Sequence, residues 1–168
     1  YHSYVPSTSS VGRRIDWVVF NDDKPIGMIG IGSSVYPPPK DILKHTKLSI
    51  KEYKNKFNSF ANNWRFCMRE SIRNAGTQIL KELRRQAPLY WKQKYNDDLL
   101  YLITFVAGGN NGAVYKADNW SQIGQTSGLP PHKSISMKWD THESLKEKYV
   151  KPTGENKKLI FFKRIRTK

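Results

Sequence analysis

The sequence has a single cysteine, no long apolar run and comparatively few acidic residues. Cys67 is the only thiol among the 168 residues, so a disulfide within the chain and a zinc site made of cysteines alone are excluded. A lone thiol is typical of a reducing compartment, and we expect a cytoplasmic protein. No apolar run approaches the roughly 18 residues of a membrane-spanning helix, and no signal peptide is visible.

The shortage of acidic residues leaves a large positive charge. Only 14 Asp and Glu stand against 29 Lys and Arg, which gives a formal net charge of +15. Such an excess predicts attraction to polyanions and binding that weakens with salt, so nucleic acid is the first expected partner. A solvated basic surface without a partner is the alternative.

The chain does contain enough apolar material for a core, with 38% hydrophobic and 12% aromatic residues. Its length fits a single domain, residues 1–168, and a domain of this size buries roughly two thirds of its unfolded surface. Because Tyr1 is not a natural first residue, we expect an N-terminal piece to precede it.

Apolar patterning in the first half of the chain predicts a hairpin followed by a strand. Residues 13–20 and 24–34 are apolar runs around an Asn-Asp-Asp turn. The prolines of "VYPPPK" then interrupt regular structure. The segment 42–60 stays open between helix and loop, and "NWRFCM" (63–68) predicts a short strand.

The second half predicts a helix and a buried strand, and then a short helix and a last strand. The helix 76–95 has Ile79, Leu80 and Leu83 on one face, with a break at Pro88. The continuous apolar run 99–106 predicts a central strand. The remaining elements are a short helix at 112–120, an extended return at 121–127, a long basic loop region at 129–157 and a final strand at 158–165. This order predicts an α/β fold with one mixed sheet.

The stretch "MRESIRNAGTQILKEL" (68–83) has the composition of an anion-binding loop. A strand ends there and a helix begins, and the free amides and dipole of a helix start favour a pyrophosphate. Arg69 and Arg73 add positive charge, Gly76 would let a phosphate approach, and Asn74 or Thr77 could cap the helix. Ordinary helix capping is the competing interpretation, and it is the one that such residues favour.

The stretch "GAVYKADNW" (112–120) offers a candidate acid. A tyrosine on a short helix, after a strand that splays from its neighbour, can protonate a leaving thiolate. Tyr115 has this position, and Asn119 and Trp120 follow it. A packing aromatic is the alternative role for this side chain.

Together these two stretches resemble the Gcn5-related N-acetyltransferase superfamily. Arg73 and Gly76 match its pyrophosphate loop, although Gln78 replaces the last small residue. Tyr115 matches its tyrosine motif, with Asn119-Trp120 in place of Gly-Phe, and asparagine tolerates the left-handed conformation that glycine would adopt. The resemblance implies a mostly antiparallel mixed sheet flanked by helices and an acyl-coenzyme A donor, with Arg69, Arg73, Asn74, Gly76, Thr77 and Asn119 as cofactor-binding residues.

A narrower resemblance covers most of residues 1–128. The blocks "YHSYVPSTS", "IGMIGIGSSVYPPP", "NWRFCMRESIRNAGTQILKEL" and "LITFVAGGNNGAVYKADNWSQIGQTSG" are similar to phage Mom proteins and to the DruA domain of Druantia anti-phage systems. Mom proteins modify adenine in DNA to N6-carbamoylmethyladenine and so block restriction. The resemblance implies duplex DNA with a flipped adenine as partner, in the cytoplasm of a bacterial host. Many Mom-like sequences have an Asp after the Phe of the central strand, where this chain reads "FVAGG".

Further site residues are expected beside that tyrosine. His2 and Tyr4 occupy the family's polar N-terminal start, and His2 is a candidate base or metal ligand, or simply exposed. No zinc motif is readable, so we expect no metal site. Arg65 and Cys67 alternate along one strand and share a face, with Cys67 either a nucleophile supported by Arg65 or an inert buried thiol. A flipped base would stack on an aromatic ring, and the candidates are Trp17, Tyr36, Trp64, Trp120 and Trp139. For Trp17 and Trp64 we favour core packing.

The sequence thus favours a DNA-modifying acyltransferase-like enzyme with no membrane association. A non-catalytic DNA-binding module of a defence complex with the same fold is the alternative from another class. An N-acetyltransferase acting on protein or small-molecule amines is the third possibility.

Overall fold

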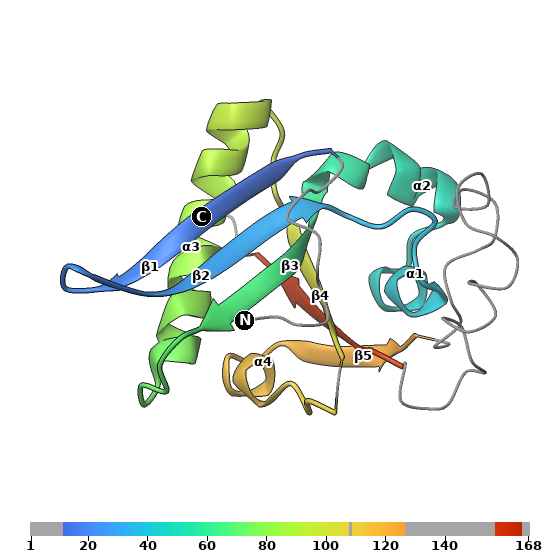
Figure 1. Cartoon of the computed structure of the whole chain (residues 1–168). Coiled ribbons are helices and arrows are strands. Elements are labelled where there is room, and N and C mark those ends of the chain that lie inside the picture. The colour runs from blue at the N-terminus through green and yellow to red at the C-terminus, as the bar shows by residue number, and fades with distance from the viewer. Residues whose placement is uncertain (1–11, 108, 127–156, 166–168) are drawn as a thin grey trace, which may run out of the picture.

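The computed structural model describes residues 12–107, 109–126 and 157–165. They form a six-stranded sheet in the order β1-β2-β3-β4-β6-β5, with helices on both faces (Figure 1). Strands β3 and β4 run parallel, and the other neighbours run antiparallel. This arrangement confirms the predicted fold class, a mixed and mostly antiparallel sheet flanked by helices.

The predicted hairpin is present as β1 (Arg14–Asn21) and β2 (Lys24–Ser33). The turn between them places Asp22 at a φ of 51°, a left-handed conformation that Asp tolerates. Strand β1 forms one edge of the sheet, and β2 lies between β1 and β3.

The open segment 42–60 contains two short helices, α1 (Lys40–Thr46) and α2 (Ile50–Asn55), and a 3₁₀ turn at Phe57–Ser59. Helix α2 begins with a capping box: Ser49 accepts from the Glu52 amide, and Glu52 accepts from the Ser49 amide. The spacing Ser-x-x-Glu is typical of a helix start. Because the sequence contains it at Ser49 and Glu52, the start of α2 could have been predicted.

Helix α3 (Ala75–Tyr95) is continuous, so the predicted break at Pro88 is wrong. Proline removes one backbone hydrogen bond and clashes with the preceding turn. The apolar stripe of α3 continues on both sides of this proline, with Leu80 and Leu83 before it and Trp91 after it, all buried against the sheet. The indole of Trp91 also donates to the Asn58 carbonyl at 2.9 Å. Burial of both halves therefore outweighs the local defect.

The predicted central strand is β4 (Tyr101–Val106), between β3 (Phe60–Met68) and β6 (Leu159–Arg164). The predicted short helix is α4 (Ala113–Ala117), and the extended return forms the edge strand β5 (Ser121–Gln125). No helix in the described ranges is long and apolar enough to cross a membrane.

Two apolar clusters lie on opposite faces of the sheet. The first packs α3 and α4 against one face and includes Ile29, Leu83, Leu102, Tyr115 and Phe161. The second packs α1 and α2 against the other face and includes Ile42, Tyr53, Phe60, Ile103 and Phe162. Figure 1 shows α3 behind β1 to β3, and α1 and α2 on the nearer side at the right.

Candidate active site

The site begins where β3 and β4 part. Their parallel ladder covers three residue pairs: Phe60–Tyr101, Ala61–Leu102 and Asn62–Ile103. Strand β3 continues to Met68 and β4 to Val106 without further pairing between them. The predicted splay is therefore present, and its first residues on the two strands are Asn63 and Thr104.

Tyr115 reaches this point from the first turn of α4. Its hydroxyl donates to Asn63 Oδ1 at 2.7 Å and lies 3.5 Å from Thr104 Oγ1. All three side chains are buried. The ring packs against Phe161, with centroids 5.7 Å apart, and against Trp120, with centroids 5.1 Å apart. The phenol is thus held between the two diverging strands.

Asn63 is fixed in the orientation that receives this hydroxyl. Its Nδ2 donates to the Gly30 carbonyl at 2.9 Å and to the Arg65 carbonyl at 3.1 Å, which leaves Oδ1 for Tyr115. Thr104 Oγ1 donates to the Asn63 carbonyl at 3.0 Å. We did not predict Asn63 or Thr104 from the sequence. Their signal is weak: each is a small polar residue inside a mostly apolar strand.

The chain leaves α4 through a turn that fixes Tyr115. Asn119 has a φ of 56°, which confirms the left-handed conformation expected there. Trp120 is 4% exposed, and its indole donates to Asp118 Oδ2 at 2.9 Å. Arg84 of α3 forms a two-pronged ion pair with Asp118. A helix as short as α4 is marginal alone, so these contacts hold it in place.

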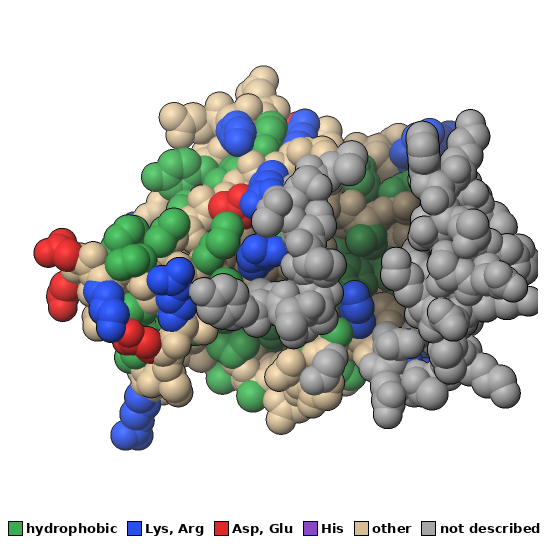
Figure 2. All heavy atoms as spheres, in the orientation of Figure 1, with side chains coloured by type: hydrophobic (Ala, Val, Ile, Leu, Met, Phe, Trp, Pro, Cys, Tyr) green, Lys and Arg blue, Asp and Glu red, His purple; other side chains and the backbone are tan. Residues whose placement is uncertain are grey.

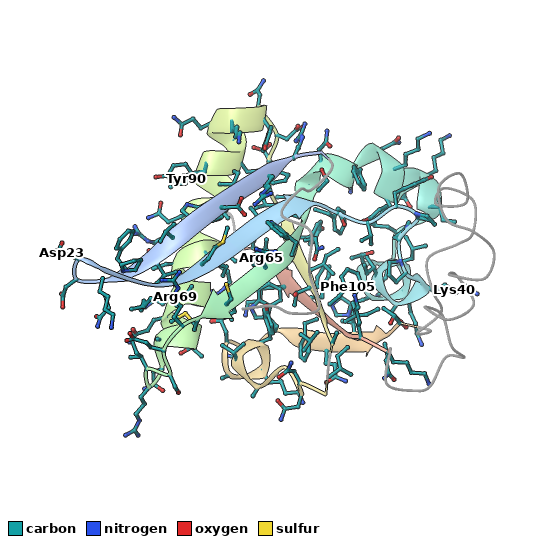
Figure 3. All side chains as sticks on the ribbon, in the orientation of Figure 1. Asp23, Lys40, Arg65, Arg69, Tyr90 and Phe105 are labelled. Carbon is teal, nitrogen blue, oxygen red and sulfur yellow. The ribbon has the colours of Figure 1, made fainter. Side chains whose placement is uncertain are left out.

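The candidate pyrophosphate loop connects β3 to α3. It forms a hollow of about 370 Å³ lined by Met68, Arg69, Glu70, Ser71, Ile72, Ala75 and Gly76. Figure 3 labels Arg69, which follows the last residue of β3. The exposed side chains of Arg69 and Arg73 have no ion-pair partner within the described residues.

The start of α3 is not capped by a side chain, so the competing interpretation of ordinary capping is wrong. Asn74 occupies the N-cap with a φ of 62°, and its side chain makes no capping hydrogen bond. The Thr77 hydroxyl instead donates to the Asn74 carbonyl at 2.9 Å. The amides of Gly76 and Thr77, in the first turn, lack an intrahelical acceptor. Free amides next to unpaired arginines favour an anion.

Packing between two helices explains why residue 76 is a glycine, and the sequence did not reveal this. A Cβ at this residue would lie 2.5 Å from Val114 Cγ2, so the glycine lets α3 and α4 approach each other. Its predicted contact with a phosphate stays a prediction.

Arg65 and Cys67 share a face of β3, as predicted, but this is not the face of Tyr115. Phe66 pairs with Ile29 and packs on the α3 side, so its neighbours Arg65 and Cys67 point to the opposite side. Cys67 is half-buried, and Arg65, labelled in Figure 3, lies 4.5 Å from the Trp64 ring. The structure does not bring these residues to Tyr115. His2 and Tyr4 lie outside the described residues.

The candidate stacking rings differ in exposure. Trp120 is buried, which excludes it as a stacking surface, and Trp17 packs against the α3 cluster, as predicted. Trp64 does not pack in the core: it lies between the guanidinium groups of Arg14 and Arg65, at 4.3 and 4.5 Å. Tyr36 is 55% exposed. Trp139 lies outside the described residues. Within the ranges that are described, no three His, Cys, Asp or Glu side chains gather as a metal site.

Comparison with known proteins gives a likeness of overall fold. No protein-family model matches the sequence, and no curated protein matches it significantly. The C-terminal condensation domain of Ebony, solved with beta-alanyl-dopamine, has 11% identity and a TM-score of 0.46, covering 89% of this chain and 72% of the other. A mosquito arylalkylamine N-acetyltransferase-like 5b has 11% identity and a TM-score of 0.45, covering 84% and 69%.

A third solved structure is a protein of the yellow fever mosquito described as arylalkylamine N-acetyltransferase 7. It has 14% identity and a TM-score of 0.47, and the match covers 90% of this chain and 65% of the other. At these identities and TM-scores, none of the likenesses bears on substrate or on site residues. The resemblance to Mom and DruA stays a prediction.

Proposed function

We propose that this chain transfers an acyl-type group from a coenzyme A thioester to an amine of DNA, with adenine N6 as the acceptor. One observation carries the proposal: the Tyr115 hydroxyl is held by Asn63 at the point where β3 and β4 part. A buried hydroxyl in a gap between strands is a suitable proton donor for a leaving group that lies in the same gap.

The residues around the gap fit a coenzyme. Strand β3 leads directly from the splay to the loop before α3, where the amides of Gly76 and Thr77 and the side chains of Arg69 and Arg73 would hold the pyrophosphate. Backbone groups of β3 and β4 beyond the ladder would contact the extended arm of the coenzyme.

The chemistry assigned to the chain is proton delivery. A coenzyme A thioester supplies an acyl carbon for attack by an amine nitrogen and a thiolate that leaves with the electrons of the C–S bond. Tyr115 would turn its proton from Asn63 Oδ1 to that sulfur and regain a proton from solvent, while packing against Trp120 and Phe161 keeps the ring in position. The attacking amine loses its own proton to solvent. This step leaves an amide on N6, whereas the carbamoylmethyl group of Mom products is attached through its CH2 carbon and would require a donor in which a bond to that carbon breaks.

Two features support DNA as the acceptor: the net charge of +15 and the resemblance to DNA-modifying Mom proteins. Adenine N6 is conjugated with the ring and stacked in the duplex, so the base has to be extruded before reaction. A non-catalytic DNA-binding module is the second candidate. It is favoured by the end of β4, where Phe105 and Val106 are followed by Ala107 and no acid (Figure 3 labels Phe105).

The test is accurate-mass analysis of nucleosides from plasmid DNA grown in cells that express the protein, with an empty-vector control. The proposal predicts a modified deoxyadenosine, and the added mass distinguishes an acetyl from a carbamoylmethyl group. If the protein is folded and binds DNA but the DNA from these cells is unmodified, the proposal of an enzyme is wrong and the DNA-binding module is favoured.

A further inference from the structure

The two helices α1 and α2 form a basic surface in which lysines outnumber acids. Exposed lysines of the segment 40–56 define what we call the α1–α2 lysine surface: Lys40, Lys44, Lys47, Lys51, Lys54 and Lys56. The same segment contains two acids, Asp41 and Glu52.

Asp41 and Glu52 do not neutralise these lysines by ion pairs. The Asp41 carboxylate lies against β5, where a Cβ on Gly124 would meet its oxygen. Glu52 accepts hydrogen bonds from the Ser49 amide at 2.8 Å and the Ser49 hydroxyl at 2.7 Å. In the described part of the chain, no lysine of the surface has an ion-pair partner.

The rest of the described molecule behaves differently. Its ion pairs involve the hairpin and the residue before it, the β3–α3 loop, α3 and the turns that follow α3 and α4: Arg13–Asp97, Arg14–Asp16, Lys24–Glu70, Arg84–Asp118, Arg85–Glu82 and Lys92–Asp98. In Figure 2 the red acidic side chains lie on the hairpin side. Among the described residues, the segment 40–56 thus carries six lysines against two acids, and none of these lysines is in an ion pair.

We propose that the α1–α2 lysine surface binds the phosphodiester backbone of duplex DNA; this rests on the proposed function in taking DNA as the acceptor. Exposed and unpaired lysines attract phosphates by charge, without reading sequence. Tyr36, 55% exposed, lies edge-on to Phe57 beside α2 with ring centroids 6.2 Å apart. Its free face would stack an unpaired base.

The position of the surface suits transfer through the β3–β4 splay. Helices α1 and α2 cover the face of the sheet opposite α3 and α4. The proposed pyrophosphate loop precedes α3, on the far side from α1 and α2 in Figure 1. DNA on the lysine surface and coenzyme on the loop would therefore lie on different sides of the sheet.

Lysines and arginines also gather at 151–168, of which 151–156 and 166–168 lie outside the described residues. Lys163 donates to the carbonyls of Asp118 and Asn119 at 2.8 Å each, so its ammonium group supports the α4–β5 turn.

The test compares two variants of the full chain that lose the same charge. The first changes Lys44, Lys47, Lys51 and Lys54 to Gln; the control changes Lys81, Arg85, Lys92 and Lys94 of α3 to Gln, all at exposed positions. Anisotropy of a fluorescein-labelled DNA duplex of mixed sequence, over a series of KCl concentrations, gives affinity and salt slope. Melting temperatures check that both variants are folded, and acetyl-coenzyme A binding is measured in parallel.

We expect the α1–α2 variant to lose at least tenfold in DNA affinity, with the log–log salt slope reduced by about 0.9 for each phosphate contact removed. The α3 control should keep most of its affinity, and both should bind acetyl-coenzyme A like the parent. Equal losses in the two variants, no loss in the first, or tighter binding to a matched RNA duplex would each overturn the proposal. If only the α1–α2 variant loses DNA affinity but the parent protein never modifies DNA, the DNA-binding role of the α1–α2 lysine surface is supported and the proposed enzymatic function is wrong.

Discussion

The two halves of the β3–β4 pair are built from the same strands but held by different forces. In the closed half, a parallel ladder joins the strands and apolar side chains fill the space, with Phe60 stacked on Tyr101 at 4.5 Å. In the open half the ladder stops, and a hydrogen-bonded group takes its place, made of Asn63, Thr104 and Tyr115.

The two halves differ in the polarity of the groups that they bury. Buried polar groups are costly unless every partner is present, and an apolar core would be simpler to build. A local departure from the rules of core packing is expected at a functional site. The open half has this character, and the predictions below test whether it carries function.

The largest effect is expected from removing one hydroxyl in the open half. Tyr115→Phe should lower the rate of DNA modification about a hundredfold to ten-thousandfold, as loss of a positioned acid does. The variant also leaves Asn63 Oδ1 without its donor, so we expect a stability loss of about 1–3 kcal/mol. Initial rates at saturating donor, well below the melting temperature, give the comparison.

The chain offers a matched control for this variant. The Tyr53 hydroxyl, in α2, is buried and bonded to Ser34 Oγ at 2.7 Å, away from the splay. Tyr53→Phe should lose a similar amount of stability and keep the parental rate. Equal rate losses in the two variants would mean that stability, and not the position of the phenol, limits the activity.

Trp120→Ala tests the support of the open half. Its ring is buried against Tyr115, so we expect a loss of about 3–5 kcal/mol in the free energy of unfolding. Chemical denaturation measures this loss. Leu89→Ala on α3, 63% exposed, is the control and should stay within about 0.5 kcal/mol of the parent. A Trp120→Ala protein as stable as that control would show that the turn after α4 is not held by this ring.

The pyrophosphate loop predicts a smaller effect, limited to coenzyme binding. Replacing Arg69 and Arg73 together by Gln should weaken acetyl-coenzyme A binding about tenfold, or about 1.4 kcal/mol. Isothermal titration calorimetry measures the affinity, and Arg85→Gln on the exposed side of α3 is the control. Unchanged affinity in the double variant would show that this loop does not bind the pyrophosphate through these arginines.

The smallest expected effect is a change of stability with pH that arises in α2, outside both halves of the β3–β4 pair. Hydrogen bonds from Ser49 lower the pKa of the Glu52 carboxyl. A lowered folded-state pKa gives stability that is present above the pKa of an unfolded glutamate, about 4.3, and is lost as the pH falls from there through the lowered pKa. Glu52 is fully exposed, so the change should be slight. Melting curves of the parent should show this acid-side loss, and those of Glu52→Gln should lack it.

Much of the fold was predictable because its signals are local. The Asn-Asp-Asp turn, the apolar run of β4 and Asn119 at the end of α4 each report on a few neighbouring residues. Tyr115 was also placed correctly, on the first turn of a short helix after a splayed strand.

The parts that failed depend on distant contacts. Asn63 and Tyr115 are separated by 52 positions, and their hydrogen bond has no trace in either local pattern. Pro88 breaks helices by a local rule, but the burial of Leu83 and Trp91 on either side decides the outcome. Gly76 resembles a phosphate-loop glycine, whereas its neighbour Val114 supplies the packing reason.

The most direct test of the central claim is the yield of modified deoxyadenosine from DNA treated with the parent, Tyr115→Phe and Tyr53→Phe proteins under one set of conditions. The account predicts modification by the parent and by Tyr53→Phe, and a loss of at least a hundredfold in Tyr115→Phe. Modification by Tyr115→Phe at the parental rate would contradict it, and the buried phenol would then be part of the core alone.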